Sequence, residues 1–191
     1  MNFSKIIRDH LDAHLAAVEQ LREQSGFIEG LARRIIAALE SGKKVIFFGN
    51  GGSAADAQHL AAEFVVRYRR NRRALPAIAL STDTSILTAG ANDFGVECIF
   101  ARQIEALADE GDIVIGISTS GGSANVIAAL QAAKERRCVT VAFTGSARNK
   151  CSQLADLTFH APSEVTAHIQ ECHITAGHIL CELVETHFIG D

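Results

Sequence analysis

The chain has 191 residues, of which 48% are hydrophobic and 21% are charged, so it can bury one full core. This composition excludes a disordered tail and a miniprotein held together by disulfides. The net charge of −4 argues against a general nucleic-acid-binding protein. Five cysteines without framework spacing indicate reduced thiols, and no apolar stretch has the length of a signal peptide or a membrane span. We therefore expect a cytoplasmic protein that binds neither nucleic acid nor membrane.

Residues 1–40 are predicted to form a helical extension. Apolar residues recur at helical spacing from Ile6 to Leu21 and from Leu31 to Leu39, with a break at Ser25–Gly26. The apolar stripe of the first helix has no obvious partner in the rest of the chain. We therefore expect this helix to project from the core and to meet another subunit.

Residues 41–191 alternate short apolar runs with helical patterns, as in an α/β core. The expected strands are residues 45–48, 76–80, 113–117, 139–143 and 157–160, and the expected helices are 54–68, 84–108 in two pieces, 124–136 and 164–186. The strands are continuous apolar runs, which is typical of a parallel sheet covered on both faces. We predict that residues 1–191 form a single domain. Its fold class is α/β, a flavodoxin-like three-layer α/β/α sandwich with a five-stranded parallel sheet plus the N-terminal helices.

The loop Ser118-Thr119-Ser120-Gly121-Gly122-Ser123 follows a predicted strand and opens a predicted helix. Its glycines let the backbone approach a ligand, and its amides and hydroxyls lie at the positive end of the helix dipole. In the alternative interpretation, the segment is a turn in which Ser123 only caps the helix. Four hydroxyls in six residues exceed what a cap needs, so the loop predicts a phosphate site.

The loop after the first strand, Gly49–Ala54, matches the Gly-x-Gly-x-x-Ala pattern of dinucleotide sites. Such a site places an acidic residue about 20 positions further on, at the end of the second strand. The first acidic residue near that strand end is Asp83, which is much too far along the chain. Asn50 beside three glycines suits contact with a polyol instead.

His59, Glu63 and Arg67 are spaced four residues apart and form one stripe on the helix that follows this loop. A histidine and a glutamate at this spacing can bind one metal ion, or the glutamate can act as a base. An ordinary surface pair has the same spacing, so the pattern leaves these alternatives open.

Five arginines lie in the run Arg67–Arg73. A nucleic-acid patch is one interpretation. A solvated helix end or a subunit contact is favoured, with Arg67 as the exception because it continues the stripe.

The last predicted helix carries Gln170 and His178 among apolar neighbours, where a histidine is usually a satisfied core or interface residue. The two residues are about 12 Å apart along a helix, too far for easy convergence on one small site. We therefore expect sites shared between subunits, with His178 of one chain facing His59 and Glu63 of another.

These motifs together resemble those of bacterial phosphoheptose isomerases, which belong to the sugar-isomerase (SIS) domain family. The motifs that carry the resemblance are Gly49–Ser53, Asp56–His59 with Glu63, Pro76–Ala79, Asn92–Gly95, Gly116–Gly121 and Ile169–Glu171 with His178. The resemblance covers about residues 5–187. It implies an aldose–ketose isomerase that converts sedoheptulose 7-phosphate to D-glycero-D-manno-heptose 7-phosphate through an enediol, for the heptose of the lipopolysaccharide core.

The resemblance also implies which residues form the site. Glu63 and His178 match the acid–base pair, and the implied ligands of one zinc ion per subunit are His59, Glu63, Gln170 and His178. The predicted substrate contacts are Asn50, Gly51, Gly52, Ser53, Glu63, Arg67, Asn92, Asp93, Ser118, Thr119, Ser120, Ser123 and Gln170. The implied assembly is a homotetramer with active sites at subunit interfaces. A glutamate and a histidine bound to zinc cannot freely exchange protons, so a structural and a catalytic role of the ion both stay open.

Two other functions are compatible with this fold, namely a non-enzymatic SIS protein that binds the bacterial replication initiator and a module that senses a sugar phosphate. The first lacks a carboxylate at the position of Glu63, so Glu63 together with His178 favours the enzyme. The chain departs from the family pattern at His168, where members often carry arginine, and in the short loop Gly145–Lys150. Either departure could alter phosphate contacts.

Overall fold

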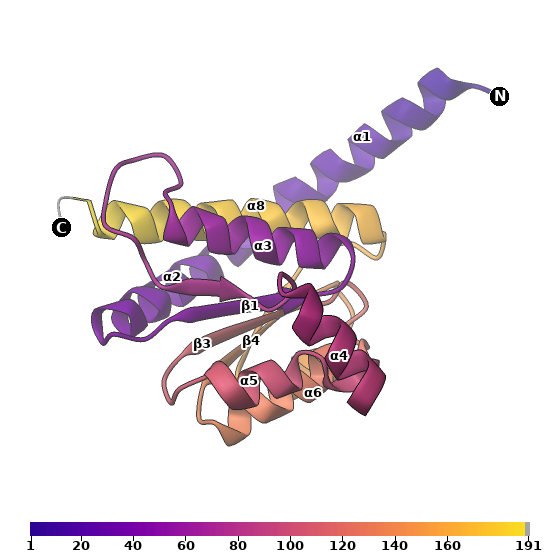
Figure 1. Ribbon diagram of the computed structural model, residues 1–191. Coiled ribbons are helices and arrows are strands. Elements are labelled where there is room, and N and C mark those ends of the chain that lie inside the picture. Colours follow the sequence, from indigo (N-terminus) through magenta and orange to yellow (C-terminus); the bar gives the residue numbers. More distant parts are fainter. Residues whose placement is uncertain (190–191) are drawn as a thin grey trace.

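The computed structural model of the chain describes residues 1–189 (Figure 1). Its sheet has five parallel strands in the order β2-β1-β3-β4-β5. The strands are β1 (Val45–Gly49), β2 (Ala77–Ala79), β3 (Ile113–Ile117), β4 (Val139–Thr144) and β5 (Leu157–His160). The predicted fold class and the five predicted strands are confirmed.

Helices precede the sheet and cover it. They are α1 (Phe3–Gln20), α2 (Ser25–Glu40), α3 (Gly52–Val65), α4 (Thr84–Phe94), α5 (Ala101–Leu107), α6 (Ala124–Glu135), α7 (Lys150–Leu154) and α8 (Thr166–His187), with the 3₁₀ helices η1 (Leu21–Gln24) and η2 (Val96–Cys98). The sequence did not predict α7, because five residues are too few to show a helical period. The predicted break at Ser25–Gly26 was wrong: η1 separates the first two helices, and both residues lie in the first turn of α2, where serine and glycine are tolerated.

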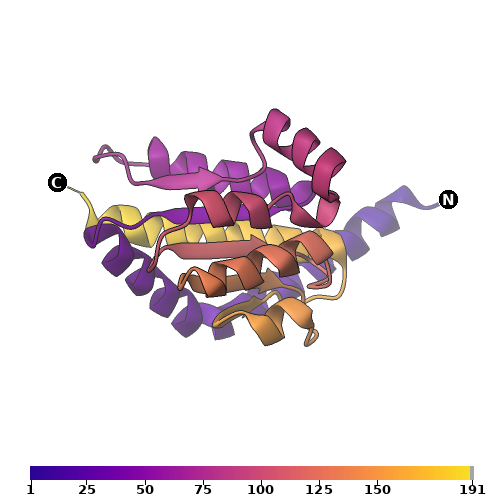
Figure 2. The same cartoon turned by 60° about the horizontal axis from the view of Figure 1, so that its bottom comes forward.

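Both faces of the sheet are buried, which explains why its strands are continuously apolar. In β1, Val45 and Phe47 pack into one core, whereas Ile46 and Phe48 pack into the other. Helices α2, α3 and α8 cover the first face, and α5, α6 and α7 cover the second (Figures 1 and 2).

Helix α1 projects away from the sandwich, as predicted (Figure 1). Of its residues, Ala17 alone is buried. Its exposed apolar residues are Phe3, Ile6, Ile7, Leu11 and Leu15, each at least 53% exposed. The expected contact of this stripe with another subunit stays a prediction. Within residues 1–189, the helices are all too short or too polar to cross a membrane.

The carboxyl ends of β1 and β3 lie side by side where the chain connections diverge. Strand β1 is followed by α3 on one face and continues to β2, whereas β3 is followed by α6 on the other face and continues to β4. Ligands of parallel sheets bind at such a divergence. We call the space bounded by residues 50–53 and 118–123 the crevice.

Candidate active site

Glycine brings the two loops of the crevice together. Gly49 pairs with Ile117 at the ends of β1 and β3, and a Cβ atom on Gly49 would lie 2.7 Å from the carbonyl oxygen of Ile117. A larger residue would therefore push the loops apart. Ser53 is buried with its side chain over Gly49, and Gly51 has a φ of +55° at the sharp entry into α3.

A reciprocal amide pair ties the loops together across the crevice. Asn50 Nδ2 donates to Asn125 Oδ1 at 2.8 Å, and Asn125 Nδ2 donates to Asn50 Oδ1 at 2.9 Å. A cleft beside this pair is also lined by Ser123 and Glu97. Sequence reasoning missed Asn125, whose partner lies 75 residues away. The pair therefore fixes the side chain of Asn50, which was predicted to contact the sugar, at the crevice.

The serine-rich loop differs from a simple capped turn. Ser118 Oγ lies 3.0 Å from Ser123 Oγ, and Ser123, the residue before α6, makes no side-chain capping hydrogen bond. The alternative in which Ser123 merely caps the helix is therefore wrong. Ser120 Oγ accepts a hydrogen bond from the backbone N–H of Gly122 at 3.2 Å. The loop thus presents a compact set of hydroxyls and amides at the N-terminus of α6, as an anion site requires.

A second cleft opens on the other side of this loop. Thr119 and Ser120 line it together with Ser146 and Asn149, which belong to the short loop singled out in the sequence. The side chain of Asn149 lies over Gly121, where a Cβ atom would come within 2.0 Å of it. The 145–150 loop therefore borders the predicted phosphate site.

His59 lies between the two predicted acid–base residues, Glu63 and His178, on the outer side of two parallel helices, α3 and α8. His59 Nε2 lies 2.8 Å from His178 Nε2 and 3.5 Å from Glu63 Oε1. We call these three residues the α3/α8 seam. They come from one chain, so the expected arrangement with His178 facing a different chain's His59 and Glu63 is wrong. The physical reason is that α3 and α8 run side by side in the same direction (Figure 1), which spacing along either helix alone does not reveal.

The surroundings of His178 favour its neutral form. Partial burial lowers the pKa of His178, as does the neighbouring His59, while Glu63 opposes the shift. The ring of Tyr68 flanks it, with the ring centroids 5.6 Å apart. Since the two imidazoles share one Nε2–Nε2 contact, one ring donates and the other accepts in the absence of an ion.

Asp56 belongs to this region, although no site role was predicted for it. It lies one turn before His59 on α3, and its Oδ2 is buried without a hydrogen-bond partner among the described residues. Burial raises the pKa of Asp56 to about 6, and the proximity of His59 opposes this effect. The three-residue spacing of Asp56 and His59 was the available signal.

Gln170 does not join the other predicted zinc ligands within one chain. Its amide lies against Gly52, where a Cβ atom would come within 2.5 Å of Gln170 Nε2. His59 is seven residues, about 10 Å, further along α3 than Gly52. The structure therefore places Gln170 at the crevice and His59 at the seam.

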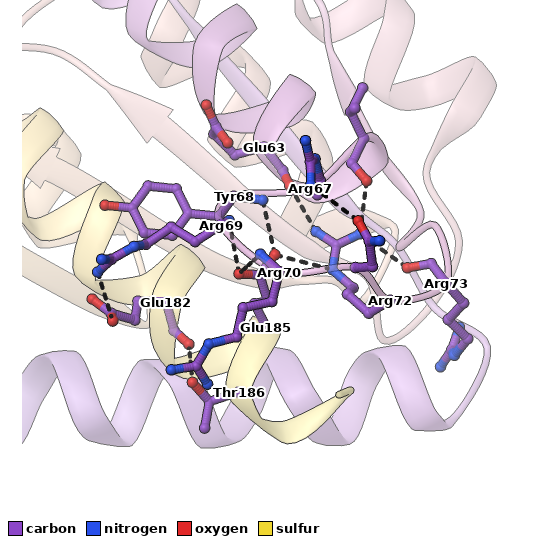
Figure 3. Close-up of polar contacts among 12 residues, drawn as sticks. Glu63, Arg67, Tyr68, Arg69, Arg70, Arg72, Arg73, Glu182, Glu185 and Thr186 are labelled. Carbon is purple, nitrogen blue, oxygen red and sulfur yellow. Dashed lines mark hydrogen bonds and ion pairs between the residues drawn. The ribbon is translucent and has the colours of Figure 1, made fainter. Parts of the chain in front are cut away.

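The arginine run is a loop held by Glu185 of α8 (Figure 3). The Glu185 carboxylate accepts hydrogen bonds from the backbone N–H groups of Tyr68, Arg69 and Arg70 at 2.8–2.9 Å. Arg72 Nε lies 3.7 Å from Glu185 Oε1, and the side chain of Arg72 is 1% exposed. The expectation of a solvated helix end was therefore wrong for Arg72.

The remaining predicted contacts lie on exposed segments. Helix α3 ends at Val65, so Arg67 does not continue the stripe of His59 and Glu63, and its guanidinium donates to Asn71 in the same loop at 3.0 Å. On α4, the exposed Asn92 donates to its neighbour Asp93 at 2.7 Å. The predicted roles of Arg67, Asn92 and Asp93 in binding substrate stay predictions.

The five-stranded parallel sheet and the crevice between its two glycine-rich loops identify the class of protein to which the chain belongs. The chain belongs to the SIS domain family, whose pattern matches residues 9–145.

Within the family, the chain is similar to phosphoheptose isomerases. The phosphoheptose isomerase of Aquifex aeolicus (strain VF5) is 56% identical over 181 residues, covering 95% of this chain and 93% of that protein. The structure of a phosphoheptose isomerase from Francisella tularensis matches with a TM-score of 0.94 at 32% identity, covering 97% of this chain and 100% of that one. The phosphoheptose isomerase from Neisseria gonorrhoeae matches with a TM-score of 0.91 at 37% identity and the same coverage. The predicted resemblance and the predicted enzyme class, a sugar-phosphate isomerase, are confirmed.

Proposed function

We propose that this enzyme converts D-sedoheptulose 7-phosphate to D-glycero-D-manno-heptose 7-phosphate, which supplies the heptose of the lipopolysaccharide core. The observation that carries the proposal is the pairing of an anion-binding loop with a carboxylate and an imidazole at the seam. The names of the relatives support the choice of a heptose phosphate.

The chemistry needs a base, a proton shuttle and a grip on the phosphate. Glu63, with its side chain 20% exposed, takes the proton from C1 of the ketose and returns it to C2. His178, kept neutral by its surroundings, moves the proton between the two sugar oxygens of the enediol. Residues 118–123 hold the distal phosphate.

We propose that the seam also binds one zinc ion per chain. His59 Nε2 faces both His178 Nε2 and Glu63 Oε1, and two imidazoles with a carboxylate are residue types that suit zinc. A bound ion would either polarise the sugar oxygens as a Lewis acid or link α3 to α8 structurally, because Glu63 and His178 cannot exchange protons freely while they bind zinc. Gln170 was the fourth predicted ligand, and its place at the crevice makes a Gln170 from another chain the available candidate.

The length of α3 argues that one catalytic site uses two chains. Glu63 lies eleven residues after Gly52, about 16 Å along the helix. At the roughly 1.2 Å per bond of an extended chain, a seven-carbon sugar phosphate reaches only about 10 Å. This separation of Glu63 from the first loop of the crevice, within one chain, supports a homotetramer with active sites at subunit interfaces.

Subunit complementation tests this arrangement. Two inactive variants, Glu63→Gln and the double variant Ser118→Ala/Ser120→Ala, are mixed under conditions that exchange subunits, and sedoheptulose 7-phosphate isomerisation is measured. We expect activity to return, because some sites combine an intact loop from one variant with an intact seam from the other. Mixing Glu63→Gln with His178→Ala is the matched control and stays inactive, since both residues belong to one seam.

The outcomes separate the parts of the proposal. A dead Glu63/Ser118/Ser120 mixture with confirmed exchange would contradict the shared site. An unmixed wild-type protein that isomerises a hexose or pentose phosphate but not sedoheptulose 7-phosphate would contradict the substrate.

A further inference from the structure

A second group of histidines lies away from the seam, where α1 crosses the start of α8. His10 and His14 are one turn apart on α1, and His168 and Glu171 are one turn apart on α8, so each pair presents both side chains on one face. Figure 1 shows α1 leaving the sandwich beside this end of α8. We call these four residues the His10 cluster.

The cluster converges on the carboxylate of Glu171. Glu171 Oε2 lies 2.7 Å from His14 Nδ1 and 2.9 Å from His168 Nδ1, and Glu171 Oε1 lies 3.8 Å from His10 Nε2. The rings of His10 and His168 have centroids 4.4 Å apart. Three imidazoles, two from α1 and one from α8, therefore surround one carboxylate.

The spacing of the ligand atoms suits a metal ion. One ligand atom each from His10, His168 and Glu171 lies within 4.8 Å of the others, and among residues 1–189 this is the one group of three such side chains that meets that limit. Nitrogen and oxygen ligands lie about 2.0–2.2 Å from zinc, so two ligands of one ion are separated by roughly 3–4 Å. Small side-chain rotations bring the three residues to that distance.

Burial and charge support the same conclusion. The side chain of His168 is 5% exposed, whereas that of His10 is 50% exposed, which leaves an open approach from the α1 side. The hydrogen bond with His168 lowers the pKa of Glu171, partial burial opposes this, and the hydrogen bond with His14 adds to it. Glu171 is therefore an anionic ligand at neutral pH.

We propose that His10, His168 and Glu171 bind one divalent transition-metal ion, of which zinc is the best match, and that His14 holds Glu171 in position. A metal-binding His–carboxylate group commonly has such an outer hydrogen-bond partner. His168 would coordinate through a ring nitrogen that carries no proton, whereas His14 keeps its N–H and donates it to Glu171.

This site is distinct from the seam. His178 lies seven residues beyond Glu171, about 10 Å along α8. The ion would join α1 to α8, and α1 has little else to fix its direction, since Ala17 is its one buried residue. The metal thus acts as a structural link that orients the projecting helix.

The experiment removes the seam first, so that its own metal binding does not interfere. The variant His59→Ala/His178→Ala is stripped of metal and titrated with Co²⁺, followed by its visible absorption, and with Zn²⁺, followed by calorimetry and elemental analysis. We expect one ion per chain and a rise in Tm on adding Zn²⁺. Adding His14→Ala should weaken binding roughly 10–100-fold, and adding His10→Ala should weaken it by more than roughly 100-fold.

His10 is half-exposed, so the His10→Ala change leaves the fold intact, which far-UV circular dichroism checks. The matched control is His187→Ala, another exposed histidine that pairs with a glutamate, Glu40, and it should leave metal binding unchanged. The proposal is overturned if the seam variant binds no ion, or if His10→Ala binds it as tightly as its parent.

Discussion

The crevice and the α3/α8 seam hold their polar groups by different means. In the crevice, Gly49 lets backbone approach backbone, Gly51 and Gly121 adopt a positive φ, and an Asn50–Asn125 amide pair locks the loops. In the seam, two packed helices bring together side chains whose positions depend on helix register. Binding of the phosphate should therefore depend on loop conformation, whereas turnover should depend on the identity of single side chains.

The largest effect expected from this contrast is at Glu63. Glu63→Gln keeps the size and removes the base, so kcat should fall roughly 10²–10⁴-fold with little change in KM. Steady-state kinetics with sedoheptulose 7-phosphate measure both constants. A near-normal kcat would remove Glu63 from the mechanism.

The next largest effect is expected at Glu185, which holds the loop that follows α3. Burial opposes ionisation of Glu185, but the backbone hydrogen bonds from Arg69, Tyr68 and Arg70 and the charge of Arg72 outweigh it, so the pKa of Glu185 is lowered. Glu185→Ala leaves three N–H groups and a buried guanidinium without their partner. We expect a loss of about 3–5 kcal/mol in the free energy of unfolding, measured by urea denaturation.

Glu182→Ala provides the control for Glu185→Ala. Its carboxylate pairs with Arg69 at the surface, 3.3 Å away, with both side chains about half exposed or more. Such pairs contribute about 0–1 kcal/mol. Equal losses in the free energy of unfolding would show that the buried Glu185 stabilises the protein no more than the exposed Glu182 does.

The two regions also differ in how far the sequence predicts them. The five strands, the parallel sheet and the crevice follow from continuous apolar runs that end in glycine- and serine-rich loops, and these signals are local. An anion site at residues 118–123 could be predicted because the strand, loop and helix are consecutive in the chain.

The seam depends on contacts between distant segments, which no local pattern encodes. His59 and His178 are 119 residues apart, and their contact follows from the parallel packing of α3 on α8. The same packing explains why the role of Glu185 was not predicted. Glu185 holds the chain after Val65 in a loop, so the helical stripe of His59 and Glu63 does not continue to Arg67. Asn125 was missed for the same reason, since its partner lies on another strand end.

The inner face of α8 gives a pH-dependent prediction that contrasts with its outer face at the seam. His173 is 1% exposed, its Nε2 donates to the carbonyl oxygen of Thr144 at 3.1 Å, and burial lowers its pKa from 6.5 to about 4 against that hydrogen bond. The unfolded chain therefore binds more protons between these two values. Stability present above pH 6.5 should be lost as the pH falls to about 4, by on the order of 3 kcal/mol.

His173→Gln should remove this contribution and flatten the acid limb of stability against pH, as followed by thermal unfolding at a series of pH values. His187→Gln, at an exposed position, is the control and should leave the slope unchanged. An unchanged slope in His173→Gln would mean that other groups govern acid unfolding.

The smallest effect expected concerns the backbone of the crevice. Gly121 has a φ of +60°, and a Cβ atom there would meet the side chain of Asn149 at 2.0 Å, whereas at Gly122 the nearest contact is 3.8 Å and no positive φ is required. Gly121→Ala should therefore cost about 1–2 kcal/mol of stability for its left-handed backbone. It should also raise KM, because Asn149 must move within the cleft that Thr119 and Ser120 line. Gly122→Ala should change neither quantity, and kcat should be nearly unaffected in both variants because the seam is untouched. If Gly122→Ala raised KM as much as Gly121→Ala, the conformation of the loop would not be what positions the phosphate. The proposed difference between crevice and seam would then be wrong, because phosphate binding would not depend on the backbone conformation of the loop.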